Sequence, residues 1–230
     1  METIAGNINL VREKIAAAAV RSGRRPEDIT LIAVTKTVPP ERIKVALEHG
    51  IRHIGENRVQ EAREKIAALA GARVSWHMIG HLQKNKVKYA VRMFDMIHSI
   101  HSLELAQVVQ EQCKKINRRM SVLLEVNTSG ESSKFGCAPS EALPLMNEIY
   151  KLPNLEMKGF MTIGKFTENR AEIRACFQKL RKIFEEARSA GGKMGTLTEL
   201  SMGMSGDFEI AIEEGATMVR IGSAIFGPRM

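Results

Sequence analysis

The sequence has few aromatic residues, few cysteines and no long uninterrupted apolar run. Aromatic residues make up 5% of the 230 positions, with one tryptophan and two tyrosines against thirteen methionines, so aliphatic packing must build the core. The three cysteines, Cys113, Cys137 and Cys176, show no paired spacing. They are too few for a disulfide scaffold or a four-cysteine zinc site, and they indicate a reduced, cytoplasmic protein.

The start of the chain also lacks the marks of a targeting segment. Glu2 and Glu13 lie within it, no cationic stretch precedes its apolar residues, and those residues are interrupted too often for a signal peptide or a membrane span. Overall, 44% of the residues are hydrophobic and 26% are charged. We therefore expect a soluble globular protein, neither secreted nor inserted in a membrane, whose length fits one large domain or two small ones.

The formal net charge of +8 raises the possibility of a nucleic-acid partner. However, the basic residues alternate with acidic ones, and aromatic residues that could stack on bases are nearly absent. The basic runs at 84–88 and 114–119 are typical of solvent-exposed helix faces. We expect a small anionic ligand and no nucleic acid.

Short apolar runs, many of them rich in β-branched residues, alternate with amphipathic segments along the whole chain. The apolar positions Val59, Ala62, Ile66 and Leu69 have helical spacing, as have those between Ile173 and Ala187, and Ile4–Ile15 predicts an extra helix before the first strand. Gly50 and Gly215 stand where helices should end. The eight expected strands lie at 31–34, 52–55, 74–79, 96–99, 121–126, 159–163, 197–201 and 218–221.

Eight strands alternating with helices predict a (β/α)8 TIM barrel that occupies residues 1–230 as a single domain. The alternative is an open, doubly wound sheet. That fold usually has a glycine-rich turn after its first strand, and VTKTVP (34–39) is not such a turn. The pattern favours the barrel.

A barrel of this kind carries its active site at the carboxyl ends of its strands. Lys36 lies at the end of the first strand. Burial there would disfavour its charged form and make it a nucleophile for carbonyl groups, able to form a Schiff base. The alternative, a lysine that simply emerges into solvent, fits its position equally well.

The loops after the seventh and eighth strands have the composition of a phosphate site. Glycines would let backbone N–H groups approach an anion, and Ser201, Ser205 and Ser223 could add hydroxyl donors. The alternative is ordinary turn chemistry and helix capping. Two such loops at the two expected positions, one containing Gly222, favour the phosphate interpretation.

A Schiff-base lysine beside a phosphate site suggests a phosphorylated aldehyde, which could be pyridoxal 5′-phosphate or the sugar-phosphate substrate of an aldolase. Arg220 lies just before the second loop, where it could donate a hydrogen bond to a pyridine nitrogen and keep that nitrogen unprotonated. Such a ring is a weaker electron sink than one paired with a carboxylate. The alternative role for Arg220 is an ion pair inside the barrel.

Several motifs are spread over almost the whole chain: AVTKT (33–37), GENRVQE (55–61), WHMIGHLQKNK (76–86), VNTSGE (126–131), GFMTI (159–163), SMGMSGDFE (201–209) and VRIGSAIFG (219–227). Together they resemble the pyridoxal phosphate homeostasis protein family, which is related to the N-terminal barrel of bacterial alanine racemase. Two positions depart from the family pattern: His101 stands where aspartate is common, and Ser223 where threonine is common.

The resemblance implies a covalent internal aldimine between pyridoxal 5′-phosphate and Lys36. By the same resemblance Ser205, Gly222 and Ser223 hold the phosphate with help from Ser201. Arg220 faces the ring nitrogen and Asn57 lines the pocket.

The resemblance also implies binding more than turnover: a carrier or buffer in intracellular vitamin B6 homeostasis that passes the cofactor to apo-enzymes. Alanine racemase needs a second acid/base, a tyrosine from a C-terminal β domain. Here we expect no such domain after the eighth unit, and the only tyrosines, Tyr89 and Tyr150, fall on helices. Two-base racemisation is poorly supported, so we expect no enzyme and a monomer. A pyridoxal-phosphate-dependent racemase or lyase, and a nucleic-acid or protein adaptor, are the alternatives.

Histidine pairs invite a metal interpretation that the spacing does not support. His77 and His81 lie four residues apart, but no third ligand with suitable spacing is evident, and the same holds for His98 with His101. We expect structural or pocket-lining roles and no metal. Lys134, after the fifth strand, could attract phosphate or be an ordinary solvated loop lysine.

Overall fold

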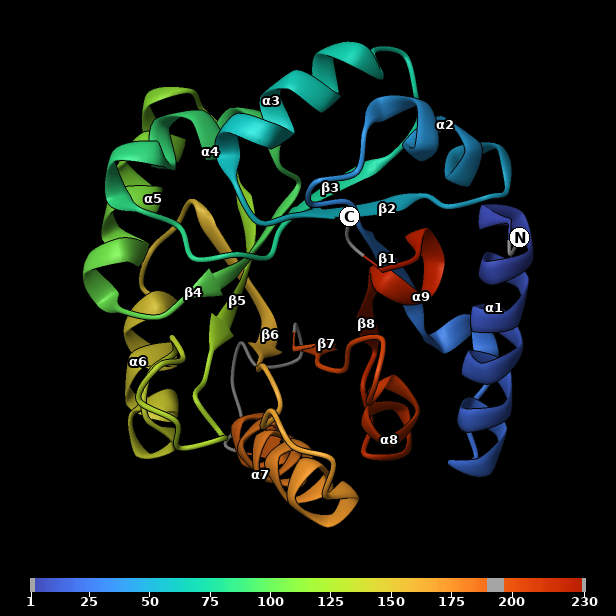
Figure 1. The fold of residues 1–230 in the computed structure, drawn as a ribbon. Helices are drawn as coiled ribbons and strands as arrows, with labels where there is room; N and C mark the ends of the chain where they lie inside the picture. The colour runs from blue at the N-terminus through green and yellow to red at the C-terminus, as the bar shows by residue number, and fades with distance from the viewer. Residues whose placement is uncertain (1–2, 190–196, 229–230) are drawn as a thin grey trace.

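The computed structural model describes residues 3–189 and 197–228, which form a closed barrel of parallel strands (Figure 1). The strands follow one another around the barrel in chain order, and β8 pairs with β1 to close it. The TIM barrel predicted from the alternating pattern is therefore confirmed. The strands are β1 (Thr30–Val34), β2 (His53–Glu56), β3 (Ser75–Met78), β4 (Met96–Ile100), β5 (Met120–Glu125), β6 (Leu155–Met161), β7 (Glu199–Ser201) and β8 (Met218–Ile221).

Helices surround the barrel, and the extra N-terminal helix is present (Figure 1). It packs against α2, α8 and α9. Thr3 caps its start, with Oγ1 accepting from Gly6 N at 3.1 Å. The helices are α1 (Ile4–Arg21), α2 (Pro40–Glu48), α3 (Val59–Ala68), α4 (Val87–Met93), α5 (Leu103–Lys115), α6 (Ala142–Ile149), α7 (Arg170–Ser189), α8 (Phe208–Glu213) and α9 (Ser223–Phe226).

The predicted element boundaries agree with the structure to within a few residues at most ends. Gly50 and Gly215 follow α2 and α8 with φ of +80° and +98°, as expected of residues that end helices. One boundary differs more, because β6 begins at Leu155 and not at 159. β1 ends at Val34, as the range 31–34 predicted, so Lys36 lies in the following turn and not at the strand end itself.

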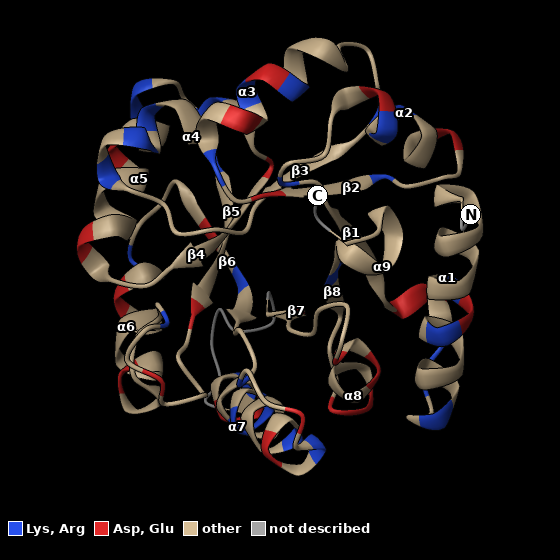
Figure 2. Cartoon of the chain, viewed as in Figure 1, with Lys and Arg blue, Asp and Glu red and all other residues tan. Residues whose placement is uncertain are grey.

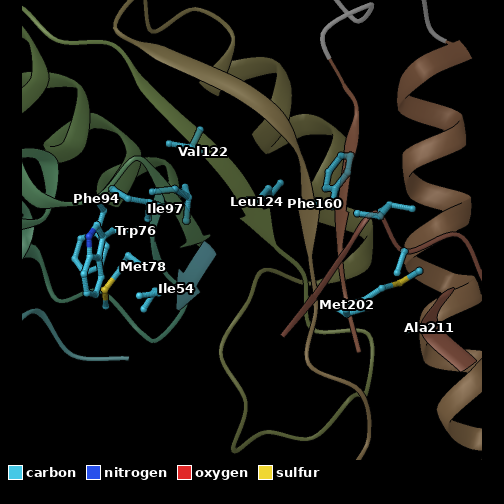
Figure 3. Packing of buried hydrophobic residues seen from close by; sticks show 14 of the residues in the cluster. Ile54, Trp76, Met78, Phe94, Ile97, Val122, Leu124, Phe160, Met202 and Ala211 are labelled. Atoms are coloured by element: carbon cyan, nitrogen blue, oxygen red, sulfur yellow. The ribbon is translucent and has the colours of Figure 1, made fainter. Parts of the chain in front are cut away.

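The core lies between the strands and the surrounding helices and is largely aliphatic. Trp76 packs in it with Met78 and Phe94, beside Ile54 and Ile97 (Figure 3). Most strand residues are buried, whichever face they lie on, which explains why most strands appear in the sequence as continuous apolar runs.

Basic and acidic residues are interspersed on several outer helices, including α1, α3 and α7, whereas α8 carries acidic residues alone (Figure 2). Lys114 and Lys115 at the end of α5 are exposed, as expected. Arg118 differs, because it donates to Val91 O at 2.7 Å and to Phe94 O at 2.8 Å and thereby ties two segments together. No helix among the described residues has the length and apolar character needed to cross a membrane.

Candidate functional site

Lys36 lies in a tight turn between β1 and α2. It is half-buried, and the next residue, Thr37, has a φ of +62°. This left-handed conformation is unfavourable for a β-branched residue and must be held by its surroundings. Lys36 lines a pocket of about 170 Å³ together with Val34, Gly222 and Ser223.

Charged side chains hold the residues on both sides of Lys36. Lys65, from α3, donates to Thr35 O at 2.6 Å and to Glu56 Oε1 at 2.7 Å. Glu56 also accepts a short hydrogen bond from the Thr35 hydroxyl. On the other side, Glu61 Oε2 accepts from Thr37 N at 3.1 Å. We call Lys65, Glu56 and Glu61 the Lys36 clamp.

The Lys36 clamp is mostly removed from water. Glu56 is 0% exposed and Lys65 is 6% exposed. Burial raises the pKa of Glu56, while the hydrogen bonds from Lys65 and Thr35 act in the opposite direction. An ion pair in such a place contributes geometry more than net stability.

The loops after β7 and β8 meet beside the turn that holds Lys36. Ser205 Oγ, from the β7 loop, accepts hydrogen bonds from the backbone N–H groups of Gly222 and Ala224, each at 3.3 Å. Gly222 lies against the first strand, since a Cβ there would be 3.2 Å from Val34 O. Two backbone donors thus converge on one oxygen atom, which is the arrangement that a phosphate group requires.

Gly203 shapes the β7 loop. Its φ is +93°, and a Cβ at this position would lie 2.5 Å from Ala211 Cβ and 2.9 Å from Phe208 Cα. Only glycine fits there. Its carbonyl accepts from Arg220 N at 3.0 Å and so joins the two loops.

Arg220 is buried below these loops, with 4% of its surface exposed. Its guanidinium donates to Ser201 Oγ at 2.7 Å and to Thr162 O at 2.8 Å. Burial lowers its pKa to about 10, so it remains charged at neutral pH. Burial also raises the pKa of Glu125, to about 7, and the positive charge of Arg220 opposes part of this increase. Among the described residues, Arg220 forms no ion pair. The structure therefore does not contain the alternative, an ion pair of Arg220 inside the barrel.

The structure brings four of the predicted site residues together at one pocket and places the other three, Ser201, Arg220 and Asn57, elsewhere. Lys36, Gly222 and Ser223 line one pocket, and Ser205 is bonded to its edge. Ser201 is 0% exposed, and its hydroxyl bonds to Arg220 inside the barrel. Asn57 lines a second pocket, with Gly80 and His81.

The other sequence candidates have structural partners. His81 stacks on Phe135 with ring centroids 3.8 Å apart, and His101 lies 5.0 Å from His81. Lys134 is not a solvated lysine, because it pairs with Glu131 and donates to Gly164 O at 2.6 Å. Within residues 3–189 and 197–228, no group of three or more His, Cys, Asp or Glu side chains could hold a metal ion.

The sequence interpretation missed the Lys36 clamp and the residues around Arg220. One signal was available. Lys65 falls three positions after Ala62, on the buried stripe of its helix, where a lysine is unusual. Thr162 and Glu125 lay inside apolar runs and gave no comparable signal.

The residues present fit a small phosphorylated aldehyde. A lysine amine lines the pocket and backbone N–H donors converge at its edge, which are the two kinds of contact that an aldehyde and a phosphate group need.

Comparisons with known proteins agree with this geometry. A family model of the alanine racemase N-terminal domain matches residues 5–230. A pyridoxal phosphate homeostasis protein of Aquifex aeolicus is 43% identical over 222 residues, covering 96% of this chain and 96% of that protein. The protein of the same name from Escherichia coli strain K12 is 40% identical over 232 residues, covering 100% of this chain and 98% of that one.

Solved structures show the same likeness. PipY of Synechococcus elongatus, solved with pyridoxal phosphate bound, has a TM-score of 0.82 at 35% identity, covering 94% of this chain and 100% of that chain. An alanine racemase of Clostridium difficile has a TM-score of 0.80 at 17% identity, covering 100% of this chain and 60% of that chain, which shows the shared fold alone.

Proposed function

We propose, from the premise that this chain belongs to the pyridoxal phosphate homeostasis protein family, that it binds pyridoxal 5′-phosphate and acts as an intracellular carrier or buffer of it. The observation that carries the proposal is the shared pocket of Lys36 and the phosphate-loop residues Gly222 and Ser223. An amine that condenses with aldehydes and donors that bind phosphate lie within reach of one small molecule.

Each contact of the ligand falls to a particular part of the site. Lys36 Nζ would hold the ligand through its aldehyde, as a Schiff base formed with loss of water. The N–H groups of Gly222 and Ala224, with the hydroxyls of Ser205 and Ser223, hold the phosphate. Arg220 would face the ring nitrogen, and Asn57, which follows β2 and lines the second pocket, would approach the ligand from that side. The bound group supplies an electrophilic carbon and, when its nitrogen is unprotonated, a weak electron sink.

Holding the ligand, with little or no catalysis, is the role that the inventory of acid/base groups favours. A racemase needs a proton donor and acceptor on both faces of the substrate carbon. Tyr89 lies on α4 and is 41% exposed, and Tyr150 directly follows α6. No tyrosine is among the described residues that line the pocket with Lys36. We also propose that the protein acts in the cytoplasm as a monomer.

The experiment that tests the binding role is an absorbance titration with pyridoxal 5′-phosphate. The wild-type protein should develop a Schiff-base band, and Lys36→Ala should not. Lys44→Ala, an equivalent change on the exposed face of α2, is the matched control and should behave as wild type. A normal band in Lys36→Ala would remove Lys36 from its role.

Two further assays separate a carrier from an enzyme. Steady turnover of any amino acid at roughly 1 per second or above would favour the racemase or lyase alternative. Transfer from the loaded protein to an apo-enzyme, measured with a trap for free pyridoxal 5′-phosphate, distinguishes a donor from a reservoir. Transfer that survives the trap identifies a direct donor.

A further inference from the structure

A continuous chain of hydrogen-bonded side chains runs through the interior of the barrel. His53 Nδ1 lies 3.0 Å from His77 Nε2, and His77 Nδ1 lies 2.9 Å from His98 Nε2. His98 Nδ1 lies 2.9 Å from Ser201 Oγ, which accepts from Arg220 at 2.7 Å. We call His53, His77, His98 and Ser201 the imidazole chain.

This arrangement differs from the usual filling of such a barrel. Interior positions are normally occupied by layers of branched aliphatic side chains. Here His77 is 3% exposed and His98 is 0% exposed. Burying these rings is unfavourable unless every nitrogen finds a partner, and the links between them supply those partners.

All three imidazoles favour the neutral form. Burial lowers the pKa of His77 to about 3 and that of His98 well below its usual range, and burial also lowers the pKa of His53. A neutral imidazole donates from one nitrogen and accepts at the other. The imidazole chain therefore has a direction, because every ring must point its N–H group the same way along it.

Two proton arrangements fit the same heavy-atom positions. Arg220 can only donate, so the Ser201 hydroxyl accepts from it in both. In one arrangement Ser201 donates to His98 and all rings donate toward His53. In the other His53 donates to His77, and the sequence of donors ends with His98 donating to Ser201.

The two ends of the imidazole chain lie at opposite ends of the barrel. His53 is the first residue of β2, is half-buried, and lines a surface pocket with Arg12, Glu27 and Thr30. Ser201 is the last residue of β7 and is fully buried beside Arg220. The charged groups near the two ends of the imidazole chain also differ. Asp95 and Glu199 favour a proton at His53, whereas Arg220 disfavours one at His98.

We propose that the imidazole chain is a proton path between the buried Arg220, two residues before the pocket residue Gly222, and the opposite end of the barrel. A proton taken up at His53 Nε2 displaces the one on Nδ1 to His77 Nε2. The proton on His77 Nδ1 then moves to His98 Nε2, and that on His98 Nδ1 moves to Ser201 Oγ. The original Ser201 hydrogen leaves toward the pocket, so every group ends neutral; the reverse sequence exports a proton.

The path deepens the proposed function and rests on it. An amine must lose a proton before it attacks an aldehyde, and a proton must return when water leaves the adduct, so loading and release both require proton transfer at the site. Arg220 is buried, and water does not reach this end of the site freely. A proton path speeds loading and release equally and leaves the equilibrium between them unchanged.

The test uses a substitution that keeps the hydrogen bonds and removes proton transfer. His77→Gln retains one donor and one acceptor, and it is neutral like the histidine it replaces, but an amide does not relay a proton. His49→Gln makes the same change at the exposed end of α2 and is the control. Rates of Schiff-base formation and release are measured by stopped-flow absorbance in H2O and in D2O, with Kd from equilibrium titration.

We expect His77→Gln to slow loading and release by the same factor, about tenfold, with Kd unchanged. Wild type and His49→Gln should load equally fast and more slowly in D2O. Wild-type rates in His77→Gln, or a weaker Kd that arises from faster release alone, would overturn the proposal. Absence of the Schiff-base band from the wild-type protein would instead contradict the proposed function.

A second measurement needs no variant. In 15N NMR spectra of the wild-type protein, the two nitrogens of a neutral imidazole report which one carries hydrogen. We expect saturation with pyridoxal 5′-phosphate to change the tautomer balance of His53, although His53 does not line the ligand pocket. Unchanged His53 nitrogens at saturation would count against the path.

Discussion

Lys65 Nζ lies 2.6 Å from the carbonyl oxygen of Thr35, the residue before Lys36. A buried cation from α3 thus holds the turn that carries the proposed Schiff-base lysine. Thr37, on the other side, keeps a left-handed conformation while its N–H group donates to Glu61. The position of Lys36 therefore depends on residues of β2 and α3.

Replacing Lys65 by methionine should weaken both the fold and the site. Glu56 would be left buried without its cation, which costs about 3 kcal/mol of unfolding free energy. The released turn should lower the affinity for pyridoxal 5′-phosphate roughly tenfold. Urea unfolding and absorbance titration measure the two effects, with Lys44→Met on the exposed side of α2 as the control.

Glu61→Gln tests the Lys36 clamp with a smaller change than Lys65→Met. The amide oxygen still accepts from Thr37 N, but the charge is lost. We expect wild-type stability within about 1 kcal/mol and a smaller loss of affinity than in Lys65→Met. Wild-type affinity in both variants would show that the Lys36 clamp does not position the lysine.

The buried Glu125 should make stability depend on pH. Its pKa in the folded protein is about 7, above the ordinary value of 4.5. The folded state then binds more protons than the unfolded state between these values, so stability is highest below pH 4.5 and falls as pH rises through 7. The wild-type protein should lose about 3 kcal/mol of unfolding free energy between pH 5 and pH 8, and Glu125→Gln should abolish this loss. Denaturant unfolding at both pH values measures this, and Glu111→Gln on the exposed face of α5 should retain the loss.

Two glycines in one loop should differ in how much the same substitution destabilises the protein. Gly203→Ala forces a Cβ to within 2.5 Å of Ala211 Cβ at a φ of +93°. A Cβ at Gly206 meets nothing within 4 Å. We expect thermal unfolding to show a loss of about 2 kcal/mol or more for Gly203→Ala and a change within about 0.5 kcal/mol for Gly206→Ala. Equal effects would contradict the role of Gly203 in shaping the loop.

Ser205 should matter only for ligands that carry phosphate. Its hydroxyl lies against the N–H groups of Gly222 and Ala224. Ser205→Ala should weaken binding of pyridoxal 5′-phosphate about tenfold and leave pyridoxal, which lacks the phosphate, within about twofold. Ser205→Thr keeps the hydroxyl and should restore most of the affinity. An equal loss for both ligands would place Ser205 outside the phosphate site.

Local patterns in the sequence were sufficient for the architecture. The spacing of Val59, Ala62 and Ile66 predicted α3, and the eight apolar runs predicted the strands, because burial on both faces of a strand leaves a continuous apolar signature. Because such barrels carry their active sites at the carboxyl ends of the strands, Lys36, Gly222 and Ser223 were expected at the site, and the structure brings them into one pocket. The start of β6 was missed because its first half alternates buried and half-buried residues.

Side-chain pairing inside the barrel could not be predicted in the same way. Ser201 was expected beside the phosphate, but its hydroxyl bonds to His98, 103 positions away in the sequence. His77 and His98 each looked like half of an incomplete metal site, whereas they bond to each other. Nothing near either histidine in the sequence identifies its partner.

The sequence by itself determined that the chain forms a barrel, and that a lysine and two glycine-containing loops lie at its carboxyl end. These features depend on periodicity and on order along the chain, which are local properties. Only the tertiary structure decided that Lys65 holds the Lys36 turn and that His53, His77, His98 and Ser201 form one chain. The reason is that the tilt and register of the strands select which inward side chains come within hydrogen-bond distance, and that choice involves the whole barrel at once.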